Sequence, residues 1–193
     1  EAILKLRHDE TLQETTPQFV QRLEQAGIGD YLPYAVSASS GSGYGNGLWS
    51  AQPLQQPADA EFPSSASAMP AGTIRFDNGA LPVRFVSVHT TSPTAQSWDL
   101  WRKSLTEMQQ LTARTGTQYV LMGDFNATYD HAVFRDLLGS RFQDAARASG
   151  HGLVFSWPAD KPWLPAFSGI DHIVTERGVV VGQVSTVRIG GSD

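Results

Sequence analysis

A short strand that is apolar on both faces is the feature that most constrains the fold of this chain. Residues 119–124, with the sequence YVLMGD, form an almost wholly apolar run that ends in an aspartate. Because side chains alternate across a strand, such a run places hydrophobic groups on both faces of its sheet. That sheet needs cover from other elements on both sides. The chain is therefore expected to fold into stacked layers.

The rest of the chain supplies helices and strands for these layers. Thr16 and Pro17 are typical of a helix start and Gly27 of a helix stop. Helices are predicted over residues 17–26, 96–115 and 132–138. Strands are predicted over residues 34–38, 47–50, 73–76, 83–89, 119–124, 154–157, 170–175 and 179–187, with an irregular loop over 55–72. No repeat and no linker divides the chain, so we expect residues 1–193 to form one domain of the α/β (α+β) class.

Composition excludes several classes of site and partner. The chain has no cysteine, which rules out disulfide frameworks and thiolate metal sites. Its formal net charge of −5 gives no long-range attraction for polyanions. This charge weakens a non-specific nucleic-acid interpretation, but it leaves room for an enzyme that meets phosphate through a bound cation. No apolar run approaches the roughly 18 residues that a membrane-spanning helix needs.

Polar side chains stand where two of the predicted strands end. In the segment MGDFNAT, Asp124 and Asn126 share one face of the emerging strand, and in VSVHTTSP His89 closes an apolar strand. Each residue also has a plainer explanation. Asp and Asn both favour tight turns, and a single His is often a structural residue with satisfied hydrogen bonds. Position alone leaves both interpretations open.

Three further carboxylates extend this pattern. Asp171 lies in an apolar strand, where a carboxylate is costly without a partner, while His172 points to the opposite face. Glu14 precedes the helix capped by Thr16, so its alternative role is to stabilise that helix start. Asp193 is the last residue. Four carboxylates, one Asn and one His at strand ends exceed what turns require, and oxygen donors without Cys fit a hard cation such as Mg²⁺ or Mn²⁺.

Seven segments together resemble the endonuclease/exonuclease/phosphatase superfamily. They follow the family's order along nearly the whole chain, and GDFNA with a later DHI and GSD is a specific combination. The resemblance implies a four-layer α/β/β/α sandwich, the deoxyribonuclease I-like fold. The closest likeness is to a bacterial branch with VHTxSP and TWP-like motifs. The matching segments are LQE, GLWSAQPL, VHTTSP, GDFNAT, FSWP, GIDHIV and GGSD.

The resemblance assigns a role to each matching residue. Glu14 resembles the family's metal-binding Glu, and Asp193 the Asp of its closing Ser-Asp-His motif, near the same cation. Asp124 resembles the residue that orients or deprotonates the attacking water. Asn126 would donate to a non-bridging phosphate oxygen, and His89 would contact the scissile phosphate.

Two further residues and three departures complete the comparison. Asp171 corresponds to the carboxylate that orients the motif's final His, and Tyr44 is a loose match to a phosphate-contacting Tyr. The family's first-strand Asn is absent, so the domain is expected to lack its first strand. The stretch before Glu14 reads RHDETLQE where the family has an apolar strand, so we expect residues to be missing after EAILKL. The chain also stops at Asp193, before the family's catalytic His.

The resemblance implies a Mg²⁺- or Mn²⁺-dependent hydrolase of phosphate esters. Its substrate would be a phosphodiester, with nucleic acid and phospholipid both open. The alternative is a non-catalytic binding or regulatory module, because a fold can persist after losing its site. Nothing in the residues indicates a protein partner, and we expect a monomer. The bacterial branch often lies beyond a membrane-anchoring segment, so the resemblance allows an extracytoplasmic, membrane-anchored protein without fixing the location.

Overall fold

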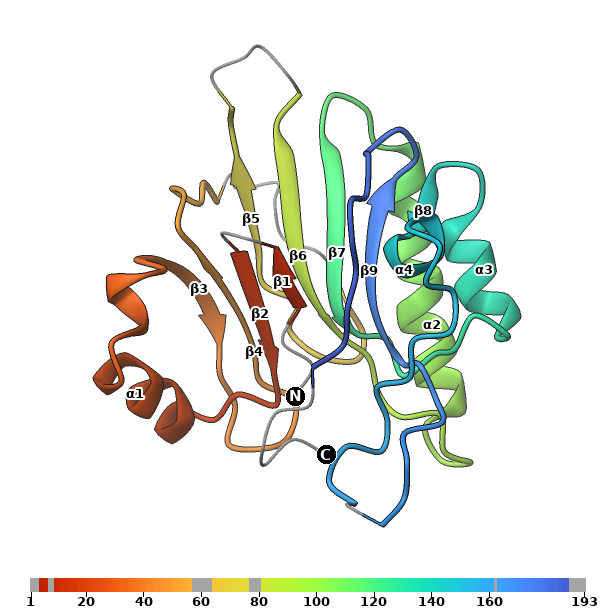
Figure 1. Cartoon of the computed structure of the whole chain (residues 1–193), viewed down its shortest axis with the longest axis horizontal. Coiled ribbons are helices and arrows are strands. Elements are labelled where there is room, and N and C mark those ends of the chain that lie inside the picture. Colours follow the sequence, from red (N-terminus) through yellow and green to blue (C-terminus); the bar gives the residue numbers. More distant parts are fainter. Residues whose placement is uncertain (1–3, 7–8, 57–63, 77–80, 162, 188–193) are drawn as a thin grey trace.

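Two β-sheets pack face to face, and helices cover both outer faces (Figure 1). The computed structural model describes residues 4–6, 9–56, 64–76, 81–161 and 163–187. The first sheet is antiparallel and has the order β1 (Leu4–Leu6), β2 (Asp9–Gln13), β4 (Asn46–Ser50) and β3 (Tyr34–Ala38). The second has the order β5 (Ala71–Ile74), β6 (Val83–His89), β7 (Gln118–Asp124), β9 (Asp171–Glu176) and β8 (Phe142–Asp144). All its pairs are antiparallel except β6–β7.

The helices lie on opposite sides of this pair of sheets. The first sheet carries α1 (Pro17–Gln25) and the 3₁₀ helix η1 (Ile28–Asp30). The second carries α2 (Trp98–Gln109), the 3₁₀ helix η2 (Gln110–Ala113), α3 (Ala132–Leu138) and α4 (Ala145–Ala148). The expected α/β class and the four-layer α/β/β/α sandwich are therefore confirmed. None of the helices in the described ranges is long and apolar enough to cross a bilayer.

Strand β7 shows why the molecule has four layers. Leu121 belongs to the apolar cluster between the second sheet and its helices, whereas Val120 and Met122 belong to the cluster between the two sheets. The strand is thus covered on both faces, as its apolar sequence predicts. A third cluster, with Leu12 and Trp49 at its centre, lies between the first sheet and α1.

Several elements follow their sequence signals closely. Strand β6 and helix α3 have the predicted bounds. Helix α1 begins where Thr16 Oγ1 accepts a 3.1 Å hydrogen bond from Phe19 N, with Pro17 in the first turn. Gly27 ends it in the left-handed conformation, with φ 87°. The long predicted helix forms as α2 followed by η2, so it starts and ends about one half-turn inside its predicted bounds.

Two predicted strands are wrong. Residues 154–157 form a single bridge between Trp157 and Ser168, because Pro158 has no N–H to continue the pairing. Residues 179–187 form no strand, and Val180 and Val187 are exposed there. A strand needs a partner edge as well as an apolar pattern. Within the described ranges, residues 179–187 have none.

The remaining differences concern short elements. Strand β8 and helix α4 were not predicted, since three- and four-residue elements are too short to show a period. Strand β5 begins at Ala71, inside the predicted loop, and ends before the predicted residue 76. Residues 57–63 of that loop, and residues 77–80 between β5 and β6, lie outside the described residues.

The polar stretch before Glu14 is a strand. β2 pairs with β1 on one side and β4 on the other, and its side chains at Thr11 and Gln13 are buried near β6 and β7. Leu12 faces the opposite way, into the α1 cluster. Hydrogen bonding to a neighbouring strand on each edge therefore keeps this segment in the sheet, although its apolar pattern is weak. The expectation of missing residues before Glu14 stays a prediction.

The loop between β3 and β4 touches the backbone that follows β2. Thr15 N donates to Gly45 O at 3.0 Å, and Ser40 N donates to Thr15 O at 3.0 Å. A Cβ added at Gly45 would lie 1.9 Å from Thr15 O and 2.7 Å from Ser40 N. The close approach of these two backbone segments therefore requires glycine at position 45. The same hydrogen bonds fix the backbone at Thr15, directly after Glu14.

We expect Gly45→Ala to lower the free energy of unfolding by about 1–3 kcal/mol or more, because the added methyl group meets backbone that cannot turn aside. Urea unfolding followed by circular dichroism measures the change. Gly41→Ala is the matched control, since a Cβ there meets nothing within 4 Å. Equal stability of Gly45→Ala and the parent protein would show that the contact at Gly45 is not tight.

Candidate active site

Three polar residues form one row across the second sheet. His89 and Asp124 are the last residues of β6 and β7, and they are paired in register. Asp124 is paired in turn with Asp171, the first residue of β9. The ends of β6 and β7 and the start of β9 therefore bring an imidazole and two carboxylates to one edge of the sheet.

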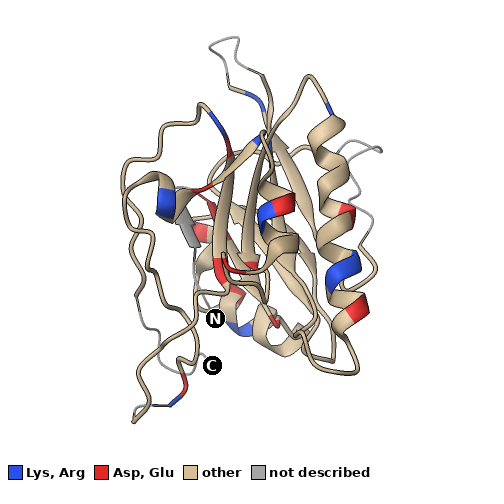
Figure 2. Ribbon diagram, turned by 90° about the vertical axis from the view of Figure 1, so that its right-hand side faces the viewer, with Lys and Arg blue, Asp and Glu red and all other residues tan. Residues whose placement is uncertain are grey.

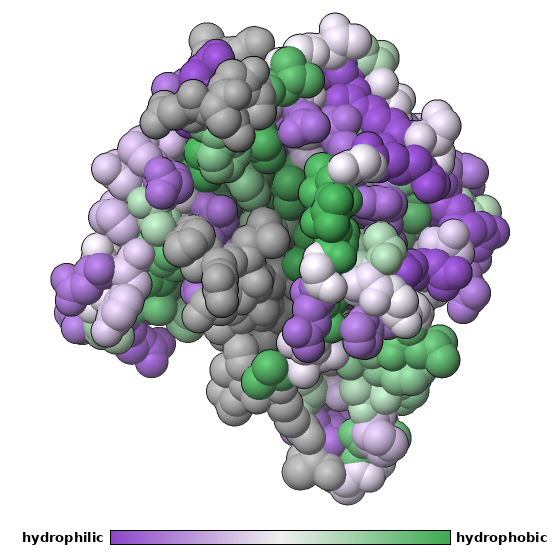
Figure 3. Space-filling view, turned by 45° about the horizontal axis from the view of Figure 1, so that its top comes forward, coloured by the Kyte–Doolittle hydropathy of each residue, from purple (hydrophilic) through white to green (hydrophobic). Residues whose placement is uncertain are grey.

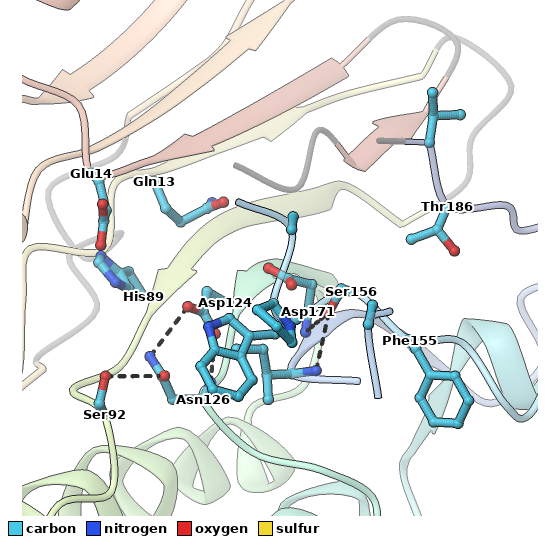
Figure 4. Close-up of a pocket in the computed structure, with 16 residues that line it drawn as sticks. Gln13, Glu14, His89, Ser92, Asp124, Asn126, Phe155, Ser156, Asp171 and Thr186 are labelled. Atoms are coloured by element: carbon cyan, nitrogen blue, oxygen red, sulfur yellow. Dashed lines mark hydrogen bonds between the residues drawn. The ribbon is translucent and has the colours of Figure 1, made fainter. Parts of the chain in front are cut away.

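This edge faces a cavity of about 220 Å³. Glu14, which follows β2 of the first sheet, reaches the same cavity, as does Asn126 from the loop after β7 (Figure 4). The structure thus brings together five of the seven predicted site residues, from four separate parts of the chain: Glu14, His89, Asp124 with Asn126, and Asp171. Asp193 lies outside the described residues.

Tyr44, the seventh predicted residue, flanks the cavity without being part of its lining. Its ring is half exposed, and the ring centroid lies 6.3 Å from that of His89, with the planes tilted by 34°. His89 itself is buried, with 5% of its surface exposed. Its ring therefore reaches the cavity from the sheet, while Tyr44 approaches from the glycine-rich loop between β3 and β4.

Asp124 and Asn126 form a hydrogen-bonded turn at the cavity wall. Asn126 N donates to Asp124 Oδ1 at 2.7 Å, and Asn126 Nδ2 donates to Asp124 Oδ2 at 3.2 Å and to Thr90 O at 2.9 Å. Ser92 Oγ donates to Asn126 Oδ1 at 3.3 Å. Turn formation and exposure to the cavity therefore occur together, so the turn does not exclude a functional role for this segment, and that role stays a prediction. Both amide hydrogens of Asn126 are already donated within the protein.

The two residues with unusual backbone conformations both lie at this cavity. Among the described residues, only Glu14 (φ 58°) and Asn126 (φ 46°) are non-glycine residues with positive φ. Such a conformation is uncommon for a residue with a Cβ and costs free energy, although Asn tolerates it better than Glu. Outliers of this kind concentrate at functional sites, so their position supports the choice of this cavity.

Asp171 is held from the loop before β9. Ser156 Oγ accepts hydrogen bonds from Ile170 N at 3.2 Å and from Asp171 N at 3.4 Å. Phe125 N donates to Ile170 O at 3.0 Å, which ties the start of β9 to the segment between Asp124 and Asn126. The backbone at both carboxylates is therefore fixed by the same small set of hydrogen bonds.

His172 faces away from this cavity, as the strand alternation predicts, and it lies part-buried in the helix-side layer. Its Nδ1 lies 2.7 Å from Asp144 Oδ2, and its Nε2 lies 2.7 Å from Ala127 O. The ring packs on Phe134 with a centroid distance of 4.3 Å. Its hydrogen bonds join β9, the end of β8 and the loop after β7. The histidine is thus a polar link behind the row of site residues.

The sequence did not single out Gln13, which also lines the cavity. Gln13 is 4% exposed, and its Nε2 donates to Ser87 Oγ at 3.4 Å across the two sheets. Its Oε1 is buried and has no hydrogen-bond partner among the described residues. The available signal was the alternation of Thr11 and Gln13 with Leu12, which puts polar groups on one face of β2. Other lining residues that the sequence left unassigned are Ser92, Phe155, Ser156, Trp157 and Thr186.

The cavity is acidic, and its side chains offer oxygen atoms that can bind a metal ion. Glu14, Asp124 and Asp171 line it, whereas no Lys or Arg belongs to the lining described by the structure. Glu14, Gln13 and Asn126 supply the carboxylate and amide oxygens that Mg²⁺ accepts. Within the described ranges, no group of three or more His, Asp or Glu side chains lies close enough together to enclose a metal ion.

Comparison with known proteins agrees with this geometry. The model of the Endonuclease/Exonuclease/phosphatase family matches residues 11–193. No curated protein matches the chain in sequence. Among solved structures, an endonuclease/exonuclease/phosphatase family protein from Leptotrichia buccalis C-1013-b has a TM-score of 0.62 at 16% identity, covering 87% of this chain and 75% of that one.

Two further solved structures have the same fold and differ in what their names say they act on. D. rerio TDP2 complexed with single strand DNA product has a TM-score of 0.62 at 16% identity, covering 88% of this chain and 70% of that one. Sphingomyelinase C from Streptomyces griseocarneus has a TM-score of 0.62 at 15% identity, covering 90% and 72%. The fold of this chain is therefore deoxyribonuclease I-like.

The Asp144–His172 pair makes a pH-dependent contribution to stability. Burial raises the pKa of Asp144, but the hydrogen bond and positive charge of His172, with the N–H and charge of Arg147, lower it below its usual 3.8. A carboxyl whose pKa is lower in the folded state stabilises the fold above its unfolded pKa. That contribution is lost as the pH falls through the folded value.

We expect Asp144→Asn to lower the free energy of unfolding by about 1–3 kcal/mol at pH 6, because the carboxylate that pairs with His172 is lost. The difference from the parent protein should shrink as the pH falls below 3.8. Urea titrations at several values between pH 6 and pH 3 measure this. Asp136→Asn, at an exposed position of α3, is the control. A difference that stays constant with pH would contradict the role of the pair.

Proposed function

The chain belongs to the endonuclease/exonuclease/phosphatase family, and we propose that it is a phosphodiesterase that uses a divalent cation, Mg²⁺ or Mn²⁺, to hydrolyse its substrate with water. The observation that carries the proposal is the convergence of Glu14, His89, Asp124, Asn126 and Asp171 on one cavity. Taken singly, Asp124 and Asn126 are explained by a turn, Glu14 by a helix start and His89 by a structural role. None of these explains why residues from both sheets share one cavity.

Glu14 and Asp193 would hold the cation. The donor chemistry of the cavity fits, since its carboxylates and amides are hard oxygen ligands and the chain has no cysteine. Mg²⁺ commonly binds proteins through one or two carboxylates and keeps several waters, so an enclosing cage of side chains is not required. When bound, the cation supplies positive charge that polarises a phosphoryl oxygen.

Asp124 would orient the attacking water and accept its proton. Asn126 fixes this carboxylate through its backbone N–H and its side-chain amide, which orients Asp124 at the wall of the cavity where the water would bind. The water oxygen forms a bond to phosphorus while the bond from phosphorus to the leaving oxygen breaks, and the leaving oxygen takes up a proton. Asp171, in the same row as Asp124, orients the histidine of the family's closing motif, as the resemblance implies.

His89 and Asn126 would stabilise the negative charge that grows on the phosphoryl oxygens. His89 reaches the cavity from the end of β6. Asn126 first serves to hold Asp124, because both of its amide hydrogens are donated. The longer of these bonds, 3.2 Å to Asp124 Oδ2, is the one that a phosphoryl oxygen would share.

The similar structures leave two substrate classes open. One is named with a single-stranded DNA product and another is a sphingomyelinase, so a nucleic acid and a phospholipid are both candidates. The family motifs describe the phosphate end of the substrate in either case. The groups that flank the phosphate must be inferred from the walls of the cavity.

We expect Asp124→Ala to lower the rate of Mg²⁺-dependent hydrolysis of bis-p-nitrophenyl phosphate by a factor of about 10² or more, because the group that orients the water is lost. Asp136→Ala, on the exposed side of α3, is the matched control and should keep the parent rate. Release of p-nitrophenol is the measurement. An Asp124→Ala variant as active as the parent protein would refute the role given to Asp124.

We expect Glu14→Gln to weaken Mn²⁺ binding by at least about tenfold, since a neutral amide replaces the charged ligand. Titration calorimetry and the electron paramagnetic resonance signal of free Mn²⁺ measure this without any substrate. Glu24→Gln, at an exposed position of α1, is the control. If neither the parent protein nor the variants bind Mn²⁺, the non-catalytic module on the same fold becomes the better account.

A further inference from the structure

Large hydrophobic side chains are exposed along one segment beside the cavity. We refer to residues 153–161 and 163–167 as the aromatic loop. Trp163 is 77% exposed and Leu153 is 84% exposed, and the loop holds five of the fifteen exposed large hydrophobic residues in the described part of the chain. Single exposed hydrophobic residues are normal, whereas a cluster beside a site indicates a binding surface. The five are Leu153, Phe155, Trp157, Trp163 and Phe167.

The loop is tied at its base and projects beyond the sheets. Trp157 and Ser168 form a bridge in which Trp157 N donates to Ser168 O at 2.9 Å and Ser168 N donates to Trp157 O at 3.0 Å. The rings of Trp157 and Phe167 pack edge to face, with centroids 5.5 Å apart. Figure 1 shows this segment, in light blue, extending below the sheets. The base is therefore anchored, and Trp163 is carried outward.

The aromatic loop is continuous with the proposed active site. Phe155 and Trp157 line the cavity that holds the site residues. Phe155 also lines a neighbouring cavity of about 200 Å³, together with Leu153 and Phe167. A molecule whose phosphate occupies the first cavity can therefore place a flanking group against these hydrophobic side chains.

Charge separates the two classes of substrate. The protein carries a formal net charge of −5, and no Lys or Arg lines the described part of the cavity. The aromatic loop contains one acid, Asp160, and one base, Lys161, so it adds no net charge. In Figure 2 the Lys and Arg residues are scattered and form no continuous stripe on the side shown. A nucleic acid presents a phosphate at every nucleotide and is bound largely through Lys and Arg. Among the described residues, this surface offers Lys161 in the loop and Arg147 in the lining of the neighbouring cavity, which is few for a polymer of phosphates.

A zwitterionic phospholipid surface fits the same observations. Its headgroups carry no net charge, so an acidic protein is not repelled, and apolar groups lie just beneath them. Trp is enriched at this depth in membranes, where its ring is both apolar and able to donate a hydrogen bond. Hydrophobic atoms are exposed at the lower edge of the molecule in Figure 3, where Figure 1 places the aromatic loop.

We propose that the aromatic loop inserts into the interface of a zwitterionic phospholipid bilayer and brings the phosphodiester of a lipid headgroup to the cavity. This inference rests on the proposed function, because it names the substrate class of that site. Trp163, the most exposed aromatic side chain of the loop, provides the contact with the bilayer interface. Phe155 and Trp157 guide the lipid at the entrance to the cavity.

Sedimentation with phosphatidylcholine vesicles tests the surface separately from the chemistry. Trp163→Ala should lower the vesicle partition coefficient by about tenfold, as expected for losing the burial of one large apolar side chain. Trp163→Phe should retain most of the binding. Tyr31→Ala, which removes an aromatic ring that is 79% exposed near α1 on the opposite side, is the matched control and should bind like the parent protein. Adding phosphatidylserine should weaken binding.

Hydrolysis of soluble bis-p-nitrophenyl phosphate by the same variants distinguishes the two proposals. Trp163→Ala should keep the parent rate on this substrate while losing activity on vesicles. A parent protein that binds vesicles through Trp163 but cleaves no phosphodiester supports the docking surface and contradicts the proposed function. Equal vesicle binding by the parent and Trp163→Ala would overturn the docking surface. So would binding restricted to a single-stranded oligonucleotide, which would make the loop a base-stacking surface.

Discussion

The close approach of backbone at the end of β7 is the constraint on which the site depends. Gly123 has φ 141°, and a Cβ there would lie 2.0 Å from Val88 O in β6 and 2.8 Å from Gln13 Nε2 in the other sheet. Glycine therefore allows three strands to meet where any side chain would separate them. Because they meet, Asp124 stands beside His89 in one sheet and faces the strand that leads to Glu14 in the other.

The sequence predicts an element well where its hydrophobic residues are buried by the protein's own core. Strand β6 and helix α3 are apolar on the faces that they bury, so their bounds follow from the sequence. Residues 154–157 and 179–187 have similar apolar patterns, yet Phe155 and Val187 are exposed beside the cavity. A hydrophobic pattern does not reveal whether its side chains are buried by the protein's own core or left exposed. This ambiguity, together with Pro158 in the first case and the lack of a partner edge among the described residues in the second, explains both wrong strands.

The candidate site likewise contains residues whose position could be predicted from the sequence and residues whose position could not. Asp124 and His89 could be predicted to lie together because they end strands of one sheet, and the strand alternation fixed the face. Gln13 could not, because its burial comes from β6 and β7, which belong to the other sheet. The Asn126 side-chain amide donates two hydrogen bonds, and one of them goes to Thr90, which is 36 residues away in sequence. The residue pattern within one segment does not predict the contacts that the segment makes with another layer.

The acidity of the cavity connects the proposed chemistry with the proposed substrate. Three carboxylates in its lining would repel a phosphate, and the proposed cation would supply the attraction. A cation can neutralise the phosphate that it touches, but it gives nothing to phosphates several ångströms farther along a polymer, where water and salt screen its charge. The described lining of this cavity has no Lys or Arg and that of the neighbouring cavity has Arg147 alone, so those additional phosphates would have few partners. A substrate with a single phosphate and apolar flanking groups would bind the cation with its phosphate and the aromatic loop with its apolar groups. Such a substrate needs no further positive charge from the protein.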